Sequence, residues 1–261
     1  MKTKRIGLFS NKILLIIMLL IIIVFVWSFA DSFSEIVDSS DWDGVVASSF
    51  TSGTGTAENP YIISNAAEFA YFRNLMMSED ANIYYNKNYA IANSFNYGGY
   101  DLSIDSEYSF MGTIDGRGNT ISNATITNNL FNEINNATIK NIAFTDIDYT
   151  LTNDTGAFLA NNIIESEIEM VLVSDNATVS NESSFGGLVY SSSDSEYHNI
   201  VINNNITSDS TDIYNFAYLL DDDNGSNILI WDNNYDSTNG TTDITFNTFD
   251  KVSDIDSLEN Y

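Results

Sequence analysis

A short apolar pattern returns through the second half of the chain at a nearly constant interval. The middle residue of an I-x-x-I-x-F run recurs at spacings of 29, 29 and 28 residues, as Ile142, Val171, Ile200 and Ile228. Another apolar residue lies twelve positions upstream of each: Leu130, Leu159, Leu188 and Phe216. A unit of this length, with two short β-rich runs, cannot bury its apolar side chains alone. The repeat therefore predicts a solenoid in which successive units stack.

The unit is β-rich throughout. Full copies of the run are Ile139–Phe144, Ile168–Val173 and Tyr197–Ile202, and Asn, Asp, Ser and Thr separate them. We align an earlier copy, Ile121-x-x-Ala124-x-Ile126, eighteen residues before the first, and a looser copy, Ile244 and Phe246, sixteen residues after the last. Stacking at about 4.8 Å per strand buries the apolar ladders. We predict an all-β, right-handed parallel β-helix (a pectin-lyase-like solenoid) over residues 112–246.

The stretch GTIDGRGNTISNATI at residues 112–126 opens this region. Asp115, Gly116 and Gly118 lie between two β-rich runs, where Gly permits positive φ and Asp bonds to the backbone downstream. A phosphate-binding loop is the alternative, but no P-loop lysine and no helical pattern follow. The stretch therefore predicts a corner of the solenoid.

Residues 51–111 carry the one clear helix signal. Pro60 precedes a short strand at Tyr61–Ile63, and Asn65 with Glu68 forms a capping-box pattern. Phe69, Phe72 and Met76 follow at helical spacing, which is typical of a packing face. We expect a cap module whose helix, Asn65–Met77, covers the exposed strand edge of the first coil.

The first thirty residues predict an export signal. A basic tail at 1–12 precedes an uncharged apolar run at 13–30, which is long enough for a transmembrane helix. The basic flank places the tail inside the cell and the remainder outside. The run acts either as a signal-anchor or as a signal peptide cleaved near Ala30. An acidic spacer at 31–50 follows, and an acidic tail at 247–261 ends the chain.

The net charge and the absence of cysteine exclude one class of partner and one class of chemistry. The net charge is −27, with 36 acidic and 9 basic residues, and four of the basic residues precede the apolar run. Such a surface repels phosphate backbones, so we expect no nucleic-acid partner. The absence of cysteine excludes disulfides and thiol chemistry.

Several segments resemble a known family. They are FMGTIDGRGNTISNATI, the preceding GTGTAENPYIISNAAEFAYFRNLM, and the later LFNEINNATIKNIAF and GGLVYSSSDSEYHNIVI. Over roughly residues 50–246 the chain is similar to adhesin-like β-helix surface proteins of bacteria and methanogenic archaea, which carry Gly-Leu repeats called GLUG. The second glycine of that motif is mostly lost here, as in Asn129-Leu130. The resemblance implies a cell-surface role.

An acidic column offers a second interpretation. Asp146, Asp175, Asn204 and Asp232 share the period of the apolar ladder, two residues past its end. Stacked about 5 Å apart, two carboxylates suit a retaining glycosidase, and the oxygen cluster suits Ca²⁺. A solvated ladder is the third reading. If the protein is an enzyme, Asp146 and Asp175 are the catalytic pair; Asp146, Asp175 and Asp232 are the Ca²⁺ ligands, and Ca²⁺ is the only cofactor indicated.

Other polar and aromatic residues carry weaker signals. His198, the only histidine, has no partner for a triad or metal site, and Asp221–Asp223 fails the EF-hand spacing. Tyrosines among polar neighbours suit sugar or protein contacts, and we select Tyr149, Tyr190 and Tyr235. We therefore expect a non-catalytic surface protein that binds glycans or a surface protein. A carbohydrate-active enzyme and a purely structural envelope component are the alternatives.

Overall fold

A computed structural model of the protein describes residues 42–180, 183–208, 210, 212–232, 236–238 and 246–250. The predicted apolar segment at 13–30, Tyr235, Ile244 and the tail from 251 lie outside these residues. Within the described part of the chain, no helix combines the length and apolar character that crossing a membrane requires. The export and anchoring predictions therefore stay predictions.

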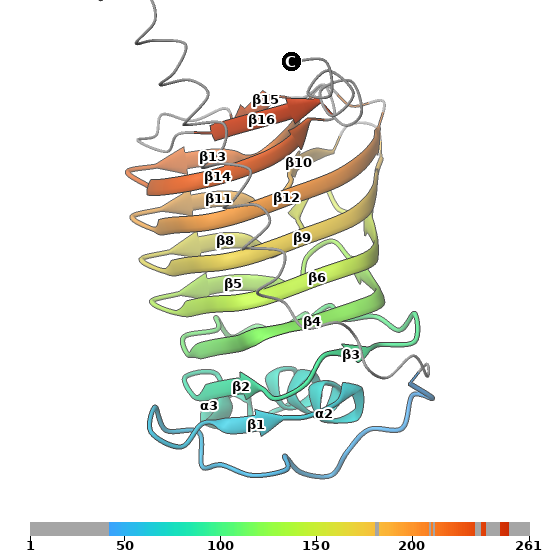
Figure 1. Ribbon diagram of the computed structural model, residues 1–261, viewed down its shortest axis with the longest axis vertical. Coiled ribbons are helices and arrows are strands. Elements are labelled where there is room, and N and C mark those ends of the chain that lie inside the picture. Colours follow the sequence, from blue (N-terminus) through green and yellow to red (C-terminus); the bar gives the residue numbers. More distant parts are fainter. Residues whose placement is uncertain are drawn as a thin grey trace, which may run out of the picture. The chain divides into compact units, whose positions relative to one another are not determined.

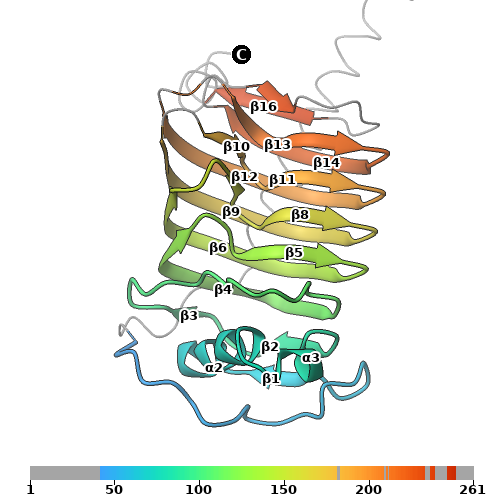
Figure 2. The ribbon, with the colours of Figure 1, turned by 180° about the vertical axis from the view of Figure 1, so that it is seen from behind.

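The described chain is a parallel β-solenoid of about six turns, as the repeat predicts. A nine-stranded sheet, here the larger sheet, runs β1-β2-β4-β6-β9-β12-β14-β16, with β3 also on β4. A seven-stranded sheet, the smaller sheet, runs β5-β8-β11-β13-β10-β7, with β15 on β13. Figures 1 and 2 show the two sheets from opposite sides. The larger sheet contains β1 (Tyr61–Ile63), β2 (Asn88–Ile91), β3 (Phe95–Asn96), β4 (Thr113–Thr127), β6 (Thr138–Leu151), β9 (Glu167–Val179), β12 (Glu196–Ser208), β14 (Asn224–Asp232) and β16 (Phe246–Asp250).

From β4 onward, each coil contributes one strand to the larger sheet and one or two strands to the smaller one. The β9 coil, for example, continues into β10 and β11, and β12 then begins the next coil. In Figure 2 the strands β5, β8, β11 and β13 are stacked in that order. The smaller sheet contains β5 (Phe131–Asn135), β7 (Thr155–Ala157), β8 (Ala160–Ile164), β10 (Ser184–Gly186), β11 (Val189–Ser193), β13 (Ile213–Asp221) and β15 (Asp236–Thr238).

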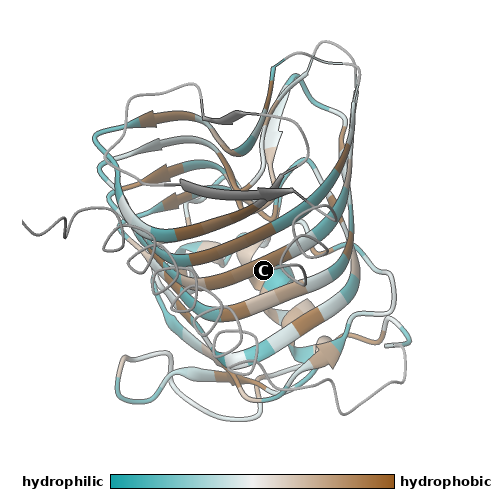
Figure 3. Ribbon diagram, turned by 45° about the horizontal axis from the view of Figure 1, so that its top comes forward, coloured by the Kyte–Doolittle hydropathy of each residue, from teal (hydrophilic) through white to brown (hydrophobic). Residues whose placement is uncertain are grey.

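The two predicted apolar ladders form the core between the sheets. Ile142 pairs with Val171, Val171 with Ile200 and Ile200 with Ile228. In the second ladder, the backbone N–H of Leu159 donates to Leu188 O at 2.8 Å. Side chains of both ladders are at most 2% exposed. Figure 3 shows the same pattern as hydrophobic bands along the long strands.

The first and last copies of the repeat are in different registers from those predicted. Ile121 pairs with Phe144, not with Ile139, and Ile114 takes the position opposite Ile139. The first unit differs because β4 carries extra residues between Asp115 and Asn119. At the other end, Phe246 pairs with Ile228, two residues away from the predicted alignment.

The helix predicted in the cap module is present, with small differences in its bounds. Helix α2 spans Ala66–Met76, and the Asn65 side chain caps it by accepting from the Glu68 N–H at 3.0 Å. Glu68 does not complete the capping box; its Oε2 accepts from Ser64 N–H at 2.7 Å instead. Phe69 and Phe72 are buried against the start of the solenoid, at ring-centroid distances of 6.0 Å (Phe69 to Phe95) and 4.6 Å (Phe72 to Tyr89). A second helix, α3, spans Ala81–Tyr84.

Candidate functional site

The Asp115 stretch is a bend within β4. Asp115 Oδ1 accepts hydrogen bonds from the Arg117 N–H at 2.9 Å and from Asn141 Nδ2 at 3.0 Å. Positive φ falls on Arg117 (53°) and Gly118 (78°). Gly116 approaches the next coil so closely that a Cβ there would lie 2.3 Å from Asn141 O. These contacts give the stretch a structural role, at the place where the following coils also bend.

The acidic column does not form in the register predicted from the sequence. Ile147, not Asp146, pairs with Asp175, because β6 has an extra residue between Phe144 and Ile147. Asp146 takes φ of 53° in this bulge and is exposed, whereas Asp175 is 4% exposed inside the solenoid. The two carboxylates are therefore on opposite sides of the sheet. The pair that a retaining glycosidase requires is not assembled by these residues.

Asp175 belongs to a polar layer in the solenoid interior. It pairs with Asn204, which is fully buried and donates from Nδ2 to Gly187 O at 3.2 Å. Among the residues described, no group of three carboxylate or imidazole side chains comes together as a metal site. The side chain of Asp232 lies outside the description, so Ca²⁺ binding stays a prediction.

Of the three selected tyrosines, Tyr149 is a correction. Its side chain is 1% exposed and its hydroxyl donates to Asn128 O, so its ring is part of the core. Burial raises the pKa of Tyr149 well above its ordinary value, and the charge of Asp175 adds to the effect. The bulge at Asp146 turns Tyr149 inward by shifting the alternation of the strand by one residue. Tyr149 therefore has no surface for a ligand.

Tyr190 lies on the outer face of the smaller sheet, beside a partner that the sequence analysis missed. Its ring is stacked on that of Tyr218 in the next coil, with centroids 4.7 Å apart and planes at 10°. Tyr214 meets Tyr218 edge-on at 5.5 Å and 77°. All three side chains are half-buried. We call Tyr190, Tyr214 and Tyr218 the tyrosine platform.

The platform continues a column of amides along the solenoid. Two positions after each member of the second apolar ladder lies an outward, half-buried residue: Asn132, Asn161, Tyr190 and Tyr218. Flanking pairs fix this register, because Val189 pairs with both Ala160 and Ala217. The sequence carries this signal, because the positions two residues after Leu130, Leu159, Leu188 and Phe216 give the column.

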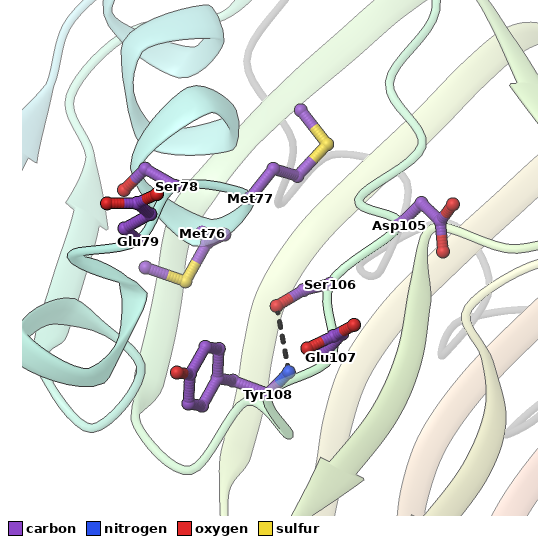
Figure 4. Close-up of a pocket in the computed structure, with 8 residues that line it drawn as sticks. All are labelled: Met76, Met77, Ser78, Glu79, Asp105, Ser106, Glu107 and Tyr108. Carbon is purple, nitrogen blue, oxygen red and sulfur yellow. Dashed lines mark hydrogen bonds between the residues drawn. The ribbon is translucent and has the colours of Figure 1, made fainter.

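Two adjoining hollows lie where the cap module meets the first coils, and Asp105 lines both. One, of about 420 Å³, is lined by Met76, Met77, Ser78, Glu79 and residues 105–108 (Figure 4). In that view Ser106 Oγ accepts from the Tyr108 N–H, at 3.0 Å. The other, of about 230 Å³, includes Arg73, Asp101, Asn129 and Asn132. Asn132 therefore connects the amide column to the second hollow.

His198 and Asp223 both contact neighbouring residues of the solenoid. His198 Nδ1 is 2.9 Å from Ser226 Oγ on the neighbouring strand, and its Nε2 is 3.7 Å from Glu196 Oε2. Asp223 is 1% exposed and accepts hydrogen bonds from Ser192 Oγ and from the N–H groups of Ser195 and Asp221. Asp223 thus holds a corner of the solenoid.

Comparison with known proteins finds no relative of this chain. No family model matches the chain, and searches of curated proteins and of solved structures find no significant match.

Proposed function

We propose that the protein is an exported, adhesin-like right-handed β-helix that binds glycans through the outer face of its smaller sheet, without catalysing a reaction on them. The observation that carries the proposal is the stacked pair Tyr190 and Tyr218, with Tyr214 edge-on beside it. Stacking covers one face of each ring, so the half-buried pair offers its remaining apolar ring surface together with two hydroxyls, and this combination suits the C–H bonds and hydroxyl groups of a pyranose ring.

The neighbouring column supplies hydrogen-bonding groups at the same repeat. Asn161 presents an amide, which both donates and accepts, whereas both N–H groups of Asn132 already donate to Asp105 Oδ1 and Ser106 O, so Asn132 offers its amide oxygen. The column advances by one strand spacing per coil, about 4.8 Å, which is similar to the length of one sugar unit. This match favours an extended glycan that lies along the solenoid axis over the four coils.

The negative charge of the chain favours neutral glycans over acidic ones. With 36 acidic and 9 basic residues, the protein repels uronic acids and sulfated sugars. Glu133 and Asp221 lie on the same strands as the column, at β5 and β13. The proposed ligand is therefore a neutral glycan.

The test applies purified full-length protein to a panel of neutral and acidic polysaccharides, with retention and newly formed reducing or unsaturated ends measured together. We expect retention on a neutral polysaccharide without new ends. Tyr218→Ser should weaken retention at least about tenfold, which corresponds to about 1.4 kcal/mol, whereas Tyr218→Phe should keep it.

The matched control is Tyr100→Ser, because Tyr100 is a surface tyrosine outside the platform, 44% exposed, and packs on Trp42 in the cap module. New ends would replace the proposal with the enzyme alternative. Absence of retention on every polysaccharide would favour the structural envelope role, and equal loss in the Tyr100 control would remove the platform as the site.

A further inference from the structure

The smaller hollow at the junction of the cap module and the solenoid has a polar lining. Its walls come from α2, from the segment after Tyr100, and from the chain around β5 and after β6. Every residue that lines it is polar: amides, carboxylates, hydroxyls and one guanidinium. We call it the junction hollow; the residues that matter here are Arg73, Asp101, Ser103, Asn129, Asn132 and Asn153.

Hydrogen bonds hold one wall of the junction hollow in place. Arg73 Nε donates to Ser103 O at 2.6 Å, and its Nη2 donates to Asp101 Oδ2 at 3.2 Å. The other Asp101 oxygen accepts from the Ser103 N–H at 3.0 Å. Ser103 Oγ is in turn bonded to the backbone of Thr127, accepting from its N–H at 2.8 Å. The guanidinium and the carboxylate are therefore fixed before any ligand arrives.

The opposite wall is equally ordered. Asn132 Nδ2 donates to Asp105 Oδ1 at 3.0 Å, and Asn132 Oδ1 accepts from Asn129 Nδ2 at 2.9 Å. Asn128 Oδ1 accepts from the N–H groups of Thr152 and Asn153, at 2.8 and 2.9 Å. Preorganised polar groups reduce the entropy that binding costs.

We propose that the junction hollow binds a single neutral sugar unit, as a second subsite at the end of the amide column. Its volume of about 230 Å³ is below the range of about 300–1,000 Å³ that is usual for drug-sized ligands, so it fits a small molecule. The interleaved donors and acceptors match a ring of hydroxyl groups. Two carboxylates, Asp101 and Asp105, against one guanidinium disfavour an anion.

The inference rests on the proposed function for its ligand class, but the site is separate from the tyrosine platform. Asn132 belongs both to the column and to the hollow, so a chain that follows the column ends at this subsite. A monosaccharide would occupy the hollow without touching the rings, and this difference allows the two sites to be tested separately.

The test uses full-length protein and the methyl glycosides of glucose, galactose, mannose and N-acetylglucosamine, with glucuronate and alanine as charged comparators. Binding is measured by saturation-transfer NMR and titration. We expect at least one neutral glycoside to bind, and we expect neither glucuronate nor alanine to bind more tightly than that glycoside. Asn153→Trp should weaken the binding of that glycoside at least about tenfold, because Asn153 is exposed at the rim and the indole fills the hollow.

The control for added bulk is Ile83→Trp, at a position 52% exposed on α3, which should leave glycoside binding unchanged. Tyr218→Ser should weaken polysaccharide retention. The subsite is overturned if no neutral glycoside binds, if Asn153→Trp binds as well as the wild type, or if glucuronate or alanine binds best. Retention that depends on Tyr218 would then still support the platform alone.

Discussion

Asp223 Oδ1 accepts a hydrogen bond from the backbone N–H of Ser195, one coil earlier, at 2.9 Å. Ser195 Oγ accepts from the Ser166 N–H, and Ser166 Oγ from the Ala137 N–H, both at 3.1 Å. In these coils a corner side chain thus satisfies a backbone donor of the coil before it. A buried N–H without a partner is costly, so this ladder stabilises the corner between the two sheets.

Replacing Asp223 should destabilise the solenoid in a pH-dependent way. Asp223→Ala removes an acceptor of three hydrogen bonds and should lower the free energy of unfolding by about 1–3 kcal/mol. Burial raises the pKa of Asp223 from its ordinary value of 3.8. The stability from this shift is present below pH 3.8 and is lost as the pH rises through the folded-state pKa.

The comparison that checks the sign is urea unfolding of the wild type and of Asp223→Asn, which keeps an acceptor but does not titrate. The advantage of the wild type should shrink as the pH rises through the folded-state pKa. A growing advantage would contradict the raised pKa. Asp221→Ala, at an exposed neighbouring position, is the control and should stay within about 0.5 kcal/mol of the wild type.

Met170 occupies a position where three other coils have asparagine. Its φ is 50°, and the equivalent residues Asn141, Asn199 and Asn227 have φ of 55°, 57° and 59°. Left-handed backbone costs a residue other than Gly, Asn or Asp roughly 1–2 kcal/mol. Met170→Asn should therefore stabilise the protein by about 1 kcal/mol in chemical denaturation. Met170→Ala keeps a Cβ without a compensating amide, so an equal gain in that variant would disprove the strain argument.

Gly187 is required for space. A Cβ at this position would lie 2.0 Å from Asn215 O and 2.8 Å from Asn204 Nδ2. Because the first clash is with backbone, Gly187→Ala should destabilise the protein by about 3 kcal/mol, the upper end of typical overpacking costs. Ser191→Ala, four residues along on the outer face, should change the melting temperature little. Similar melting temperatures for both variants would refute the close approach.

The period, the two ladders and the cap helix could be predicted because apolar spacing reports burial directly. The positions of Asp146, Asp175 and Tyr149 could not be predicted by extending that period alone. An extra residue at Asp146 reverses the alternation in β6, so the same spacing places Asp146 outside and Asp175 inside. Strand parity in β9 does predict an inward Asp175, since Val171, Val173 and Asp175 alternate in one phase.

The registers predicted for the first and last copies of the repeat were wrong for a related reason. The bend at Gly116–Gly118 adds residues to β4 that later coils lack, so Ile121 matches Phe144 instead of Ile139. A triplet pattern that tolerates one substitution can be aligned in either register. The junction hollow was missed because its residues come from four separate segments, which only the packing of the cap on the solenoid brings together.

Tyr190 should titrate above the ordinary tyrosine value of 10.0. Burial raises the pKa of its hydroxyl, and the charges of Tyr218 and Asp212 add to this. The difference in tyrosinate absorption between the wild type and Tyr190→Phe isolates this group, and Tyr218→Phe should lower its pKa toward 10.0 by removing one charge. The raised pKa contributes stability that is present below pH 10.0 and is lost as the pH rises through the folded-state value. Titration of Tyr190 at or below 10.0 would mean that its ring is not packed on Tyr218 in solution.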